Sequence, residues 1–298
     1  MDLLCFYNIK NVPDNIKYTD IYFSKEYGLL CEKSDCLIWE LCKYKDLIFV
    51  YLKKEIFIDN EKYYNLITPY GYSGISFEFT KTFDEFYKIF LDKCKEYKYN
   101  EIIIRQNPYI NIKYPEYIND KIIKQKKIYG INTNDFDEYF KKKINCSTRN
   151  MYTKACKNKY SFFIELFNHE NKQNFINMYH ETMNFLNADK YYYFNDEYFN
   201  YLINLKDNIK LCKICNEENV ILGQVLILIY NNYVHYHLSC NNRSDNCITD
   251  FMLLNIIKNF LGKTIILGGG INDNDNLSKF KKKFSTIEFD YKIYKILI

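Results

Sequence analysis

The chain has 298 residues, of which 48% are hydrophobic and 26% charged, and its formal net charge is +4. This length allows a sizeable core and suggests two domains, and the composition is typical of a soluble globular protein. The modest charge fits anionic small substrates and argues against a dedicated nucleic-acid binder, in which a strongly basic face is expected. The opening residues lack a signal-peptide pattern, and the longest apolar run, 220–230, is too short to span a bilayer, so we expect a cytoplasmic protein without a transmembrane segment.

The eleven cysteines show no framework spacing, and in a reducing compartment most should be small buried hydrophobic residues. Cys212 and Cys215 form a lone CxxC inside an expected strand, and no second pair lies at the spacing of a zinc site. We therefore expect no metal centre.

The first half of the chain reads as mixed strands and helices. The expected elements are strands at 47–58, 62–68 and 101–109 and a helix at 83–97. After the second strand, Pro69 fixes φ and Gly71 and Gly74 permit tight backbone geometry, which predicts a turn.

Two further helices are expected within 134–159, the second with Ser147 as its N-cap. We place the domain boundary between these helices. This predicts an N-terminal domain of residues 1–144 and a C-terminal domain of residues 145–298.

The second half has a clearer order of elements. Strands are expected at 161–167, 209–215, 219–230, 232–240, 264–270 and 287–298, and helices at 170–186, 195–205, 248–261 and 275–284. Asn195 is the expected N-cap of one helix and Gly262 the expected C-cap of another. The order β-α-α-β-β-β-α-β-α-β predicts an α+β domain with a mostly antiparallel meander and one crossover into a later strand.

That order is similar to the GNAT acyltransferase fold, and several segments resemble the Fem family of transferases, which build peptidoglycan cross-bridges, and their shorter bacterial relatives. The segments are TPYGYSG (68–74), STRNMYTKA (147–155), MYHETMNFLNADKYYYFNDEYF (178–199), HYHLSC (235–240) and LGGG with LSKFKKKF (267–270 and 277–284). The resemblance implies an α+β fold of two tandem GNAT-like domains, with mostly antiparallel sheets flanked by helices. It also implies that the C-terminal domain carries the activity.

The resemblance implies transfer of an aminoacyl or acyl group from an ester or thioester onto an amine. In the family's F-K motif a lysine meets the donor and stabilises the charge that develops on the acyl carbonyl; here the motif falls on Phe280 and Lys281. Gly268, Gly269 and Gly270 would let the chain pass close to the donor and deliver the lysine. The alternative for Lys281 is a solvated lysine face.

Elementary chemistry is consistent with this assignment. Attack of an amine on an ester builds an oxyanion, and a fixed cation there contributes about 3 kcal/mol, as other oxyanion donors do. The amine must lose a proton, and His237, which shares a strand face with His235, is the candidate base; a packed, hydrogen-bonded histidine is the alternative.

On the acceptor side, Tyr70, Gly71 and Tyr72 are expected to line the site from the N-terminal domain. Arg149 is a candidate for binding a ligand phosphate, or it caps a helix. Tyr193, in the tyrosine-rich stretch KYYYF, is a further acceptor-side candidate. The expected acceptor is a small-molecule or a nucleotide- or lipid-linked amino sugar of the cell envelope or of a surface polysaccharide, which allows a peripheral membrane contact.

The chain departs from its relatives before the expected helix 248–261. Ordinary GNAT enzymes cradle the coenzyme A pyrophosphate there with a glycine loop, whereas this chain has CNNRSDNCITD. The long helical arm that larger Fem proteins associate with tRNA is missing as well. Acyl-CoA and aminoacyl-tRNA therefore both stay open as donor substrates, and no other cofactor is required.

Two other classes of function stay open. A degenerate GNAT pair could bind tRNA or an anionic glycan without catalysis. Asp273 and Asp275 also form the DxD spacing by which many glycosyltransferases hold a metal and a nucleotide sugar, although that reading needs a parallel nucleotide-binding sheet upstream.

Overall fold

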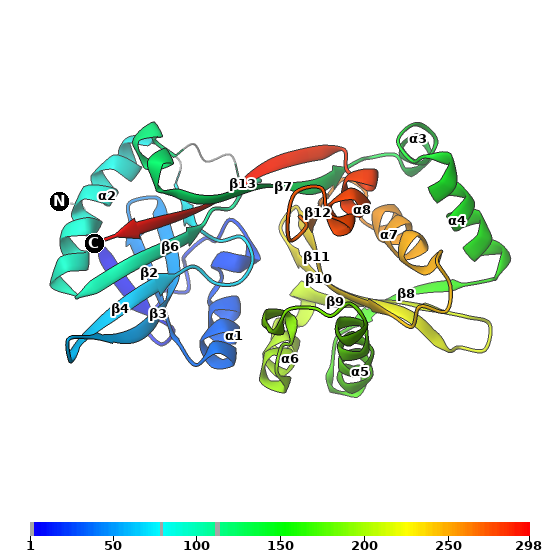
Figure 1. Cartoon of the computed structure of the whole chain (residues 1–298), viewed down its shortest axis with the longest axis horizontal. Coiled ribbons are helices and arrows are strands. Elements are labelled where there is room, and N and C mark those ends of the chain that lie inside the picture. Colours follow the sequence, from blue (N-terminus) through cyan, green and yellow to red (C-terminus); the bar gives the residue numbers. More distant parts are fainter. Residues whose placement is uncertain (1–2, 78–79, 111–113) are drawn as a thin grey trace. The chain divides into compact units, whose positions relative to one another are not determined.

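In the computed structural model the chain is described over residues 3–77, 80–110 and 114–298. It divides into two compact units: unit 1 comprises Met1–Lys127 and Phe289–Ile298, and unit 2 comprises Ile128–Glu288 (Figure 1). The domain boundary after residue 144 stays a prediction, and the compact units divide at other positions. In particular, the end of the final strand belongs to unit 1.

Unit 1 is built on an antiparallel meander that a parallel strand extends. β2, β3 and β4 pair antiparallel in that order, β1 pairs with β2, β5 pairs with β3, and β6 runs parallel to β4. The elements are β1 (Cys5–Asn8), η1 (Ile21–Phe23), α1 (Lys25–Asp35), β2 (Ile38–Tyr44), β3 (Leu47–Ile58), β4 (Glu61–Ile67), β5 (Ile75–Ser76), α2 (Thr80–Glu96), β6 (Tyr99–Arg105) and η2 (Glu116–Lys121). The apolar face of α2 buries Phe83, Phe86 and Phe90 against the core.

Unit 2 repeats this plan. β8, β9, β10 and β11 form an antiparallel series, and β12 runs parallel to β11 after the crossover through α7. The elements are α3 (Phe136–Lys142), α4 (Cys146–Lys157), β8 (Ser161–Leu166), α5 (His169–Phe185), η3 (Lys190–Tyr192), α6 (Asp196–Ile203), η4 (Lys206–Asn208), β9 (Ile209–Cys215), β10 (Ile221–Tyr230), β11 (Tyr233–Asn241), α7 (Ile248–Asn259), β12 (Thr264–Gly268) and α8 (Asn276–Phe284).

Helices cover both faces of the sheet of unit 2. α5 and α6 lie on one face, and α4 and α7 lie on the other (Figure 1). The core on the α7 side is formed by aliphatic and aromatic side chains from strands and helices, including Val225, Ile227, Phe251, Leu254 and Phe284. Burial of this apolar surface is the main force that holds the helices on the sheet.

The boundary between the two units falls inside two strands. β7 (Ile122–Asn132) leaves unit 1 and pairs antiparallel with β12 of unit 2. β13 (Ile287–Leu297) leaves unit 2 and pairs antiparallel with β6 of unit 1. The C-terminal strand that the sequence assigned to the second domain therefore completes the sheet of the first unit.

The expected fold class is confirmed: both units are α+β with mostly antiparallel sheets flanked by helices, and the order of elements in the second half is as predicted. Two caps were wrong. α4 begins after Asn145, whose side chain accepts from the N–H of Thr148, and not after Ser147. α7 ends at Asn259 and its C-cap is Phe260, two residues before Gly262.

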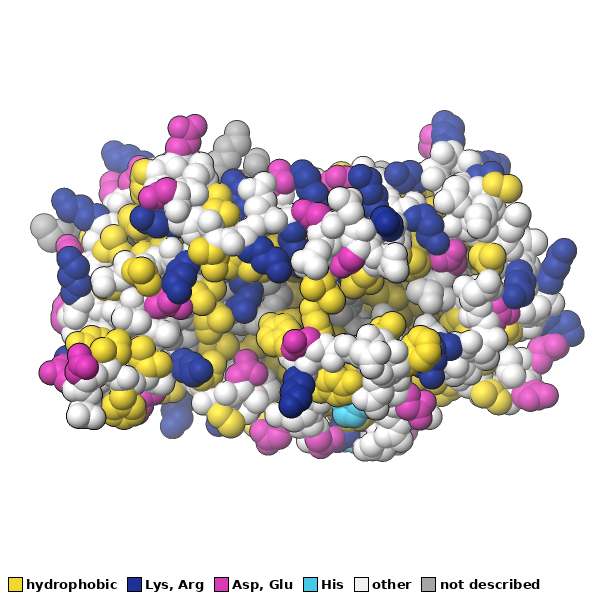
Figure 2. Space-filling view, viewed as in Figure 1, with side chains coloured by type: hydrophobic (Ala, Val, Ile, Leu, Met, Phe, Trp, Pro, Cys, Tyr) yellow, Lys and Arg dark blue, Asp and Glu magenta, His cyan; other side chains and the backbone are white. Residues whose placement is uncertain are grey.

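Charged side chains of both signs are interspersed over the face shown in Figure 2, as the modest net charge leads one to expect. Among the helices of the described ranges, none is long and apolar enough to cross a membrane.

Candidate active site

The parallel strands β11 and β12 pair over a short stretch only. Their ladder begins at Tyr233 and Thr264 and ends at His235 and Ile266, after which β11 runs on to its end at Asn241. On its other side β11 is paired with β10 over its whole length except at His237. The candidate catalytic residues of both strands follow directly after this last parallel pair: His237 lies on β11, and the glycine run closes β12.

A β-bulge sits at this point of β11. Leu226 of β10 faces Leu238 and the next residue, Ile227, faces Tyr236, so His237 is the extra residue of the bulged strand. Bulges of this kind locally disrupt the ladder and re-aim a side chain, and they are frequent beside active sites.

The glycine run turns the chain from β12 into α8. Gly268 has φ +74°, a left-handed conformation that glycine adopts without strain. A Cβ at Gly270 would lie 2.3 Å from Oδ1 of Asp275, so this glycine permits the close approach of that carboxylate.

Asp275 closes the turn and caps α8. Its Oδ1 accepts a hydrogen bond from the N–H of Ser278 at 2.6 Å, and its Oδ2 accepts from those of Ile271 and Asn272 at 2.7 and 3.0 Å. Burial by itself raises the pKa of Asp275, but the backbone N–H groups and the nearby charge of Lys281 outweigh it and hold the pKa below its ordinary value.

α8 places Lys281 at the end of β12. Its Nζ donates to the carbonyl oxygen of Gly269 at 2.8 Å, and the residue is half-buried, whereas Lys279 and Lys282 of the same helix are exposed. The structure therefore brings together Lys281 and the glycine run, as the sequence led us to expect. The helix itself is held by the buried Phe284, whose carbonyl oxygen accepts from the hydroxyl of Tyr139 at 2.7 Å.

Phe280 packs against the core of unit 2 and meets Phe284 edge to face at 5.3 Å. Lys283 is held on the same helix by Asp250, at 2.8 Å. The position of Phe280 next to Lys281 thus fits a role in shaping a pocket wall, which stays a prediction.

His237 is paired with Tyr198 of α6, a residue that sequence reasoning did not single out although it lies in the stretch 178–199. The Nε2 atom of His237 and the Tyr198 hydroxyl are 2.6 Å apart. Burial, and then the neighbouring His235, lower the pKa of His237 to about 3. The imidazole is therefore neutral near pH 7 and a weak base.

Arg149 and Tyr193, two further predicted site residues, have hydrogen-bond partners of their own. The Arg149 guanidinium donates to the carbonyl oxygens of Lys141, at 3.2 Å, and of Ile144, so it caps the end of α3, the alternative named for it. In unit 2, Tyr193 donates to Oδ1 of Asn184 at 2.8 Å.

Tyr70, Gly71 and Tyr72 lie in a tight loop of unit 1. Gly71 has φ +104°, and a Cβ there would lie 2.3 Å from the ring of Tyr22. The hydroxyl of Tyr27 donates to the carbonyl oxygen of Tyr70 at 2.9 Å, and the Tyr72 ring contacts Tyr22 edge-on at 5.8 Å. The loop is firmly held, and its role toward an acceptor stays a prediction.

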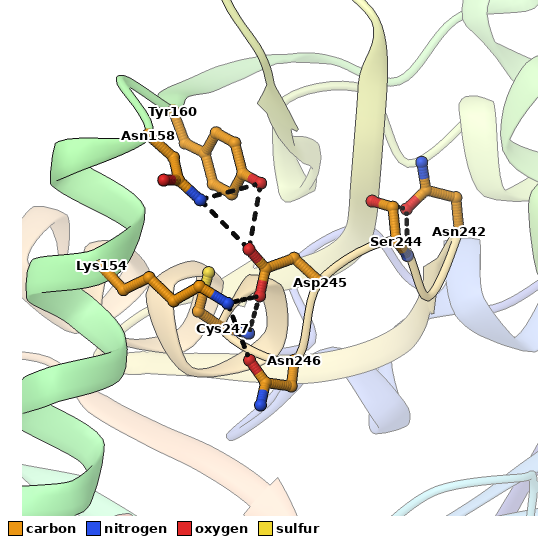
Figure 3. Close-up of polar contacts among 8 residues, drawn as sticks. All are labelled: Lys154, Asn158, Tyr160, Asn242, Ser244, Asp245, Asn246 and Cys247. Carbon is orange, nitrogen blue, oxygen red and sulfur yellow. Dashed lines mark hydrogen bonds and ion pairs between the residues drawn. The ribbon is translucent and has the colours of Figure 1, made fainter.

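The loop just before α7 holds the carboxylate of Asp245, although α7 itself has no side-chain cap at its N-cap residue Cys247 (Figure 3). Oδ1 of Asp245 accepts from the N–H of Cys247 at 3.2 Å and is 2.7 Å from Nζ of Lys154, and Oδ2 accepts from Asn158 and Tyr160. The Asp245 side chain is only 10% exposed. Burial raises its pKa, but the bonds from Lys154 and the N–H of Cys247 outweigh that effect and lower the pKa below its ordinary value.

The remaining metal-related patterns have structural roles. Asp275 of the DxD pattern is engaged by backbone N–H groups, as described above. Cys212 and Cys215 are buried free thiols of β9. Within the described ranges no group of three or more His, Cys, Asp or Glu side chains is arranged to hold a metal ion.

No protein-family model and no curated protein matches the sequence. Solved structures share its fold. FemX superimposes with a TM-score of 0.67 at 11% identity, over 95% of this chain and 93% of FemX. The chain has the fold of FemX.

Two further structures agree with this result. L-PGS from Bacillus licheniformis gives a TM-score of 0.61 at 14% identity, over 91% of this chain and 86% of that one. The C-terminal domain of a candidate lysylphosphatidylglycerol synthetase from Agrobacterium fabrum gives 0.59 at 9% identity, also over 91% and 86%. The resemblance to the fold of Fem proteins that the sequence motifs indicated is thereby confirmed.

Proposed function

We propose that the chain is a transferase that moves an aminoacyl or other acyl group from an ester or thioester onto an amino group of a cell-envelope or surface-polysaccharide precursor. The observation that carries the proposal is the position of Lys281: its ammonium group lies 2.8 Å from the Gly269 carbonyl oxygen, at the end of the parallel pair β11 and β12. The fold is that of FemX and L-PGS, and this supports the same class of reaction.

In this reaction the acceptor amine attacks the acyl carbon, and a carbon–nitrogen bond forms while the carbonyl electrons move onto oxygen. The Lys281 ammonium stabilises this oxyanion, a contribution of about 3 kcal/mol by analogy with other oxyanion donors. Collapse breaks the bond to the ester oxygen or thioester sulfur, and the proton of the amine ends on that leaving group. The negative charge on oxygen is absent from the bound substrate and develops only as the tetrahedral intermediate forms, so the effect falls on turnover.

His237 contributes as a positioning residue in this scheme. A base with a pKa of about 3 accepts a proton poorly at neutral pH, so it fits the role of general base badly. Its short bond to Tyr198 fixes the bulge of β11 beside the end of β12.

The Asp245 carboxylate just before α7 favours an aminoacyl ester, such as aminoacyl-tRNA, over a coenzyme A thioester as donor. Pyrophosphate binding at a helix N-terminus needs backbone N–H groups and tolerates no fixed negative charge beside them. Here Asp245 takes the N–H of Cys247 and is itself ionised and held by Lys154.

The test is a transfer assay with the full chain, a radiolabelled aminoacyl-tRNA pool or labelled acetyl-CoA as donor, and nucleotide-linked amino sugars as acceptors. We expect label to appear in an amide product from the tRNA pool. Retention of labelled tRNA without any product would refute catalysis and favour a binding module. Transfer from acetyl-CoA alone would refute the choice of donor.

A further inference from the structure

The strand β8 ends the sheet of unit 2 (Figure 1). It stands last in the strand order of the described residues, with β9 as its neighbour, and its ladder runs from Ser161, opposite Cys215, to Leu166, opposite Lys210. An edge strand presents a row of backbone N–H and C=O groups along its outer side, which is a template for a further strand. We propose that β8 pairs antiparallel with β8 of a second copy of the chain, so that the chain forms a dimer with a continuous sheet.

The edge lacks the devices by which sheets usually avoid such pairing, namely a proline, an exposed lysine or a bulge. The sequence of β8 is SFFIEL, and its six residues pair one to one with those of β9. Its one charged side chain, Glu165, is paired with Lys213 of β9 at 2.6 Å and accepts from the amide of Asn171 at 3.2 Å. The charge of Glu165 is therefore compensated within the chain and does not protect the edge.

Apolar side chains are exposed on both faces of β8. Phe163 is 42% exposed, Ile164 37% and Leu166 50%. Because successive side chains alternate, Ile164 and Leu166 share a face with Phe162, which packs on the α7 side of the core. Phe163 lies on the opposite face. A helix docked on one face would cover only one of these rows, whereas a further strand lies beside both.

The pattern of β8 is complementary to itself. In an antiparallel pair of identical strands, a twofold axis can place Ile164 opposite Ile164 of the second copy. Phe162 then lies opposite Leu166 of the second copy, so that the apolar row faces its own copy, and such cross-strand pairs stabilise a sheet. On the other face Phe163 lies opposite Glu165. This register covers all the exposed apolar residues of β8 within the strand itself.

The charges beside the strand favour the same arrangement. Lys157, at the end of α4, precedes β8, and Glu170, in the first turn of α5, follows it; both side chains are exposed. An antiparallel pair brings the basic end of each strand next to the acidic end of the other, whereas a parallel pair would bring like charges together. The second copy therefore supplies complementary charge as well as a matching apolar row.

The first experiment is sedimentation equilibrium of the full chain over a range of concentrations. We expect the mass to rise from 36.2 kDa toward twice that value. Hydrogen exchange on the same samples should show that the backbone of residues 161–166 becomes protected as the dimer forms. A chain that stays monomeric at about 100 µM would overturn the proposal, and so would a dimer in which β8 gains no protection.

Substitutions at the twofold axis test the register. Ile164→Lys sets two like charges opposite each other and should weaken association at least about tenfold. A mixture of Ile164→Lys and Ile164→Glu should restore the dimer, because opposite charges then meet. A mixture that stays monomeric would overturn the register through Ile164.

The matched control is Ile58→Lys, because Ile58 is also a strand isoleucine, at the end of β3 in unit 1, and is 38% exposed. Its association should equal that of the wild type, and equal losses in both lysine variants would overturn the assignment to β8. Circular dichroism checks the fold of each variant, and the hydrogen-exchange measurement on the wild type decides the proposal if a variant does not fold. Because no measurement needs turnover, the dimer is tested independently of the proposed acyl transfer.

Discussion

A Cβ atom added at Gly270 would lie 2.3 Å from Oδ1 of Asp275, the carboxylate that caps α8. Gly270→Ala must therefore displace that cap, and we expect it to lower the free energy of unfolding by about 1–2 kcal/mol, the usual cost of a lost N-cap. Urea unfolding measures the change. Asp275→Asn, which keeps a capping oxygen, should be milder than Asp275→Ala; the reverse order would argue against the cap as the cause.

Lys281→Ala should lower turnover at least about tenfold with the fold intact, because the cation that faces the acyl oxyanion is removed. Initial rates of amide formation measure the effect, and circular dichroism checks the fold. The matched control is Lys282→Ala on the same helix: Lys282 is exposed, and its ammonium lies 3.5 Å from Glu288. A rate unchanged in Lys281→Ala would remove Lys281 from the mechanism.

His237 makes stability depend on pH. Its pKa is about 3 in the folded chain and about 6.5 when unfolded, so the unfolded state binds more protons between these values. The stability it contributes is complete above pH 6.5 and is lost as pH falls toward 3. Between pH 7.5 and 5.5 the loss is about 1 kcal/mol.

The measurement is urea unfolding at those two pH values in the wild type and in His237→Asn. The variant should show a smaller loss on acidification. Equal pH dependence in both proteins would assign the titration to other groups.

The donor can be tested by thermal shift. A ligand at 100 times its dissociation constant stabilises the native state by about 2.7 kcal/mol, which is readily detected. We expect aminoacyl-tRNA to raise the melting temperature and acetyl-CoA to leave it unchanged, because the Asp245 carboxylate lies just before α7 and would repel a pyrophosphate there. Stabilisation of the wild type by acetyl-CoA would show that Asp245 does not bar the donor.

Removal of the Asp245 carboxylate should also lower the stability of the fold. Asp245→Ala leaves Lys154 and the N–H of Cys247 without their partner and should lower the free energy of unfolding by about 1–3 kcal/mol. Differential scanning calorimetry measures the loss. Asn246→Ala is the control, since Asn246 is an exposed neighbour whose side chain is 3.4 Å from Lys154.

Many elements could be located from the sequence because their signals are local. β3 and β9 begin and end at the predicted residues, and Asn195 caps α6 as predicted. Asn145, two positions before Ser147, is a capping residue of the same quality by type. Its side chain accepts from the N–H of Thr148 at 2.9 Å, so α4 begins there and Ser147 lies inside the helix. Local patterns do not choose between two such neighbouring residues.

The sequence by itself determined the periodic elements of the second half, their order, and the pairing of a glycine run with Lys281, because hydrophobic spacing and motif order depend on near neighbours along the chain. Only the tertiary structure decided what these residues contact. The pairings of β7 with β12 and of β13 with β6, the bond between His237 and Tyr198, and the contacts of Asp245 all join segments far apart in sequence. Such contacts depend on how the core packs, and no local pattern encodes them.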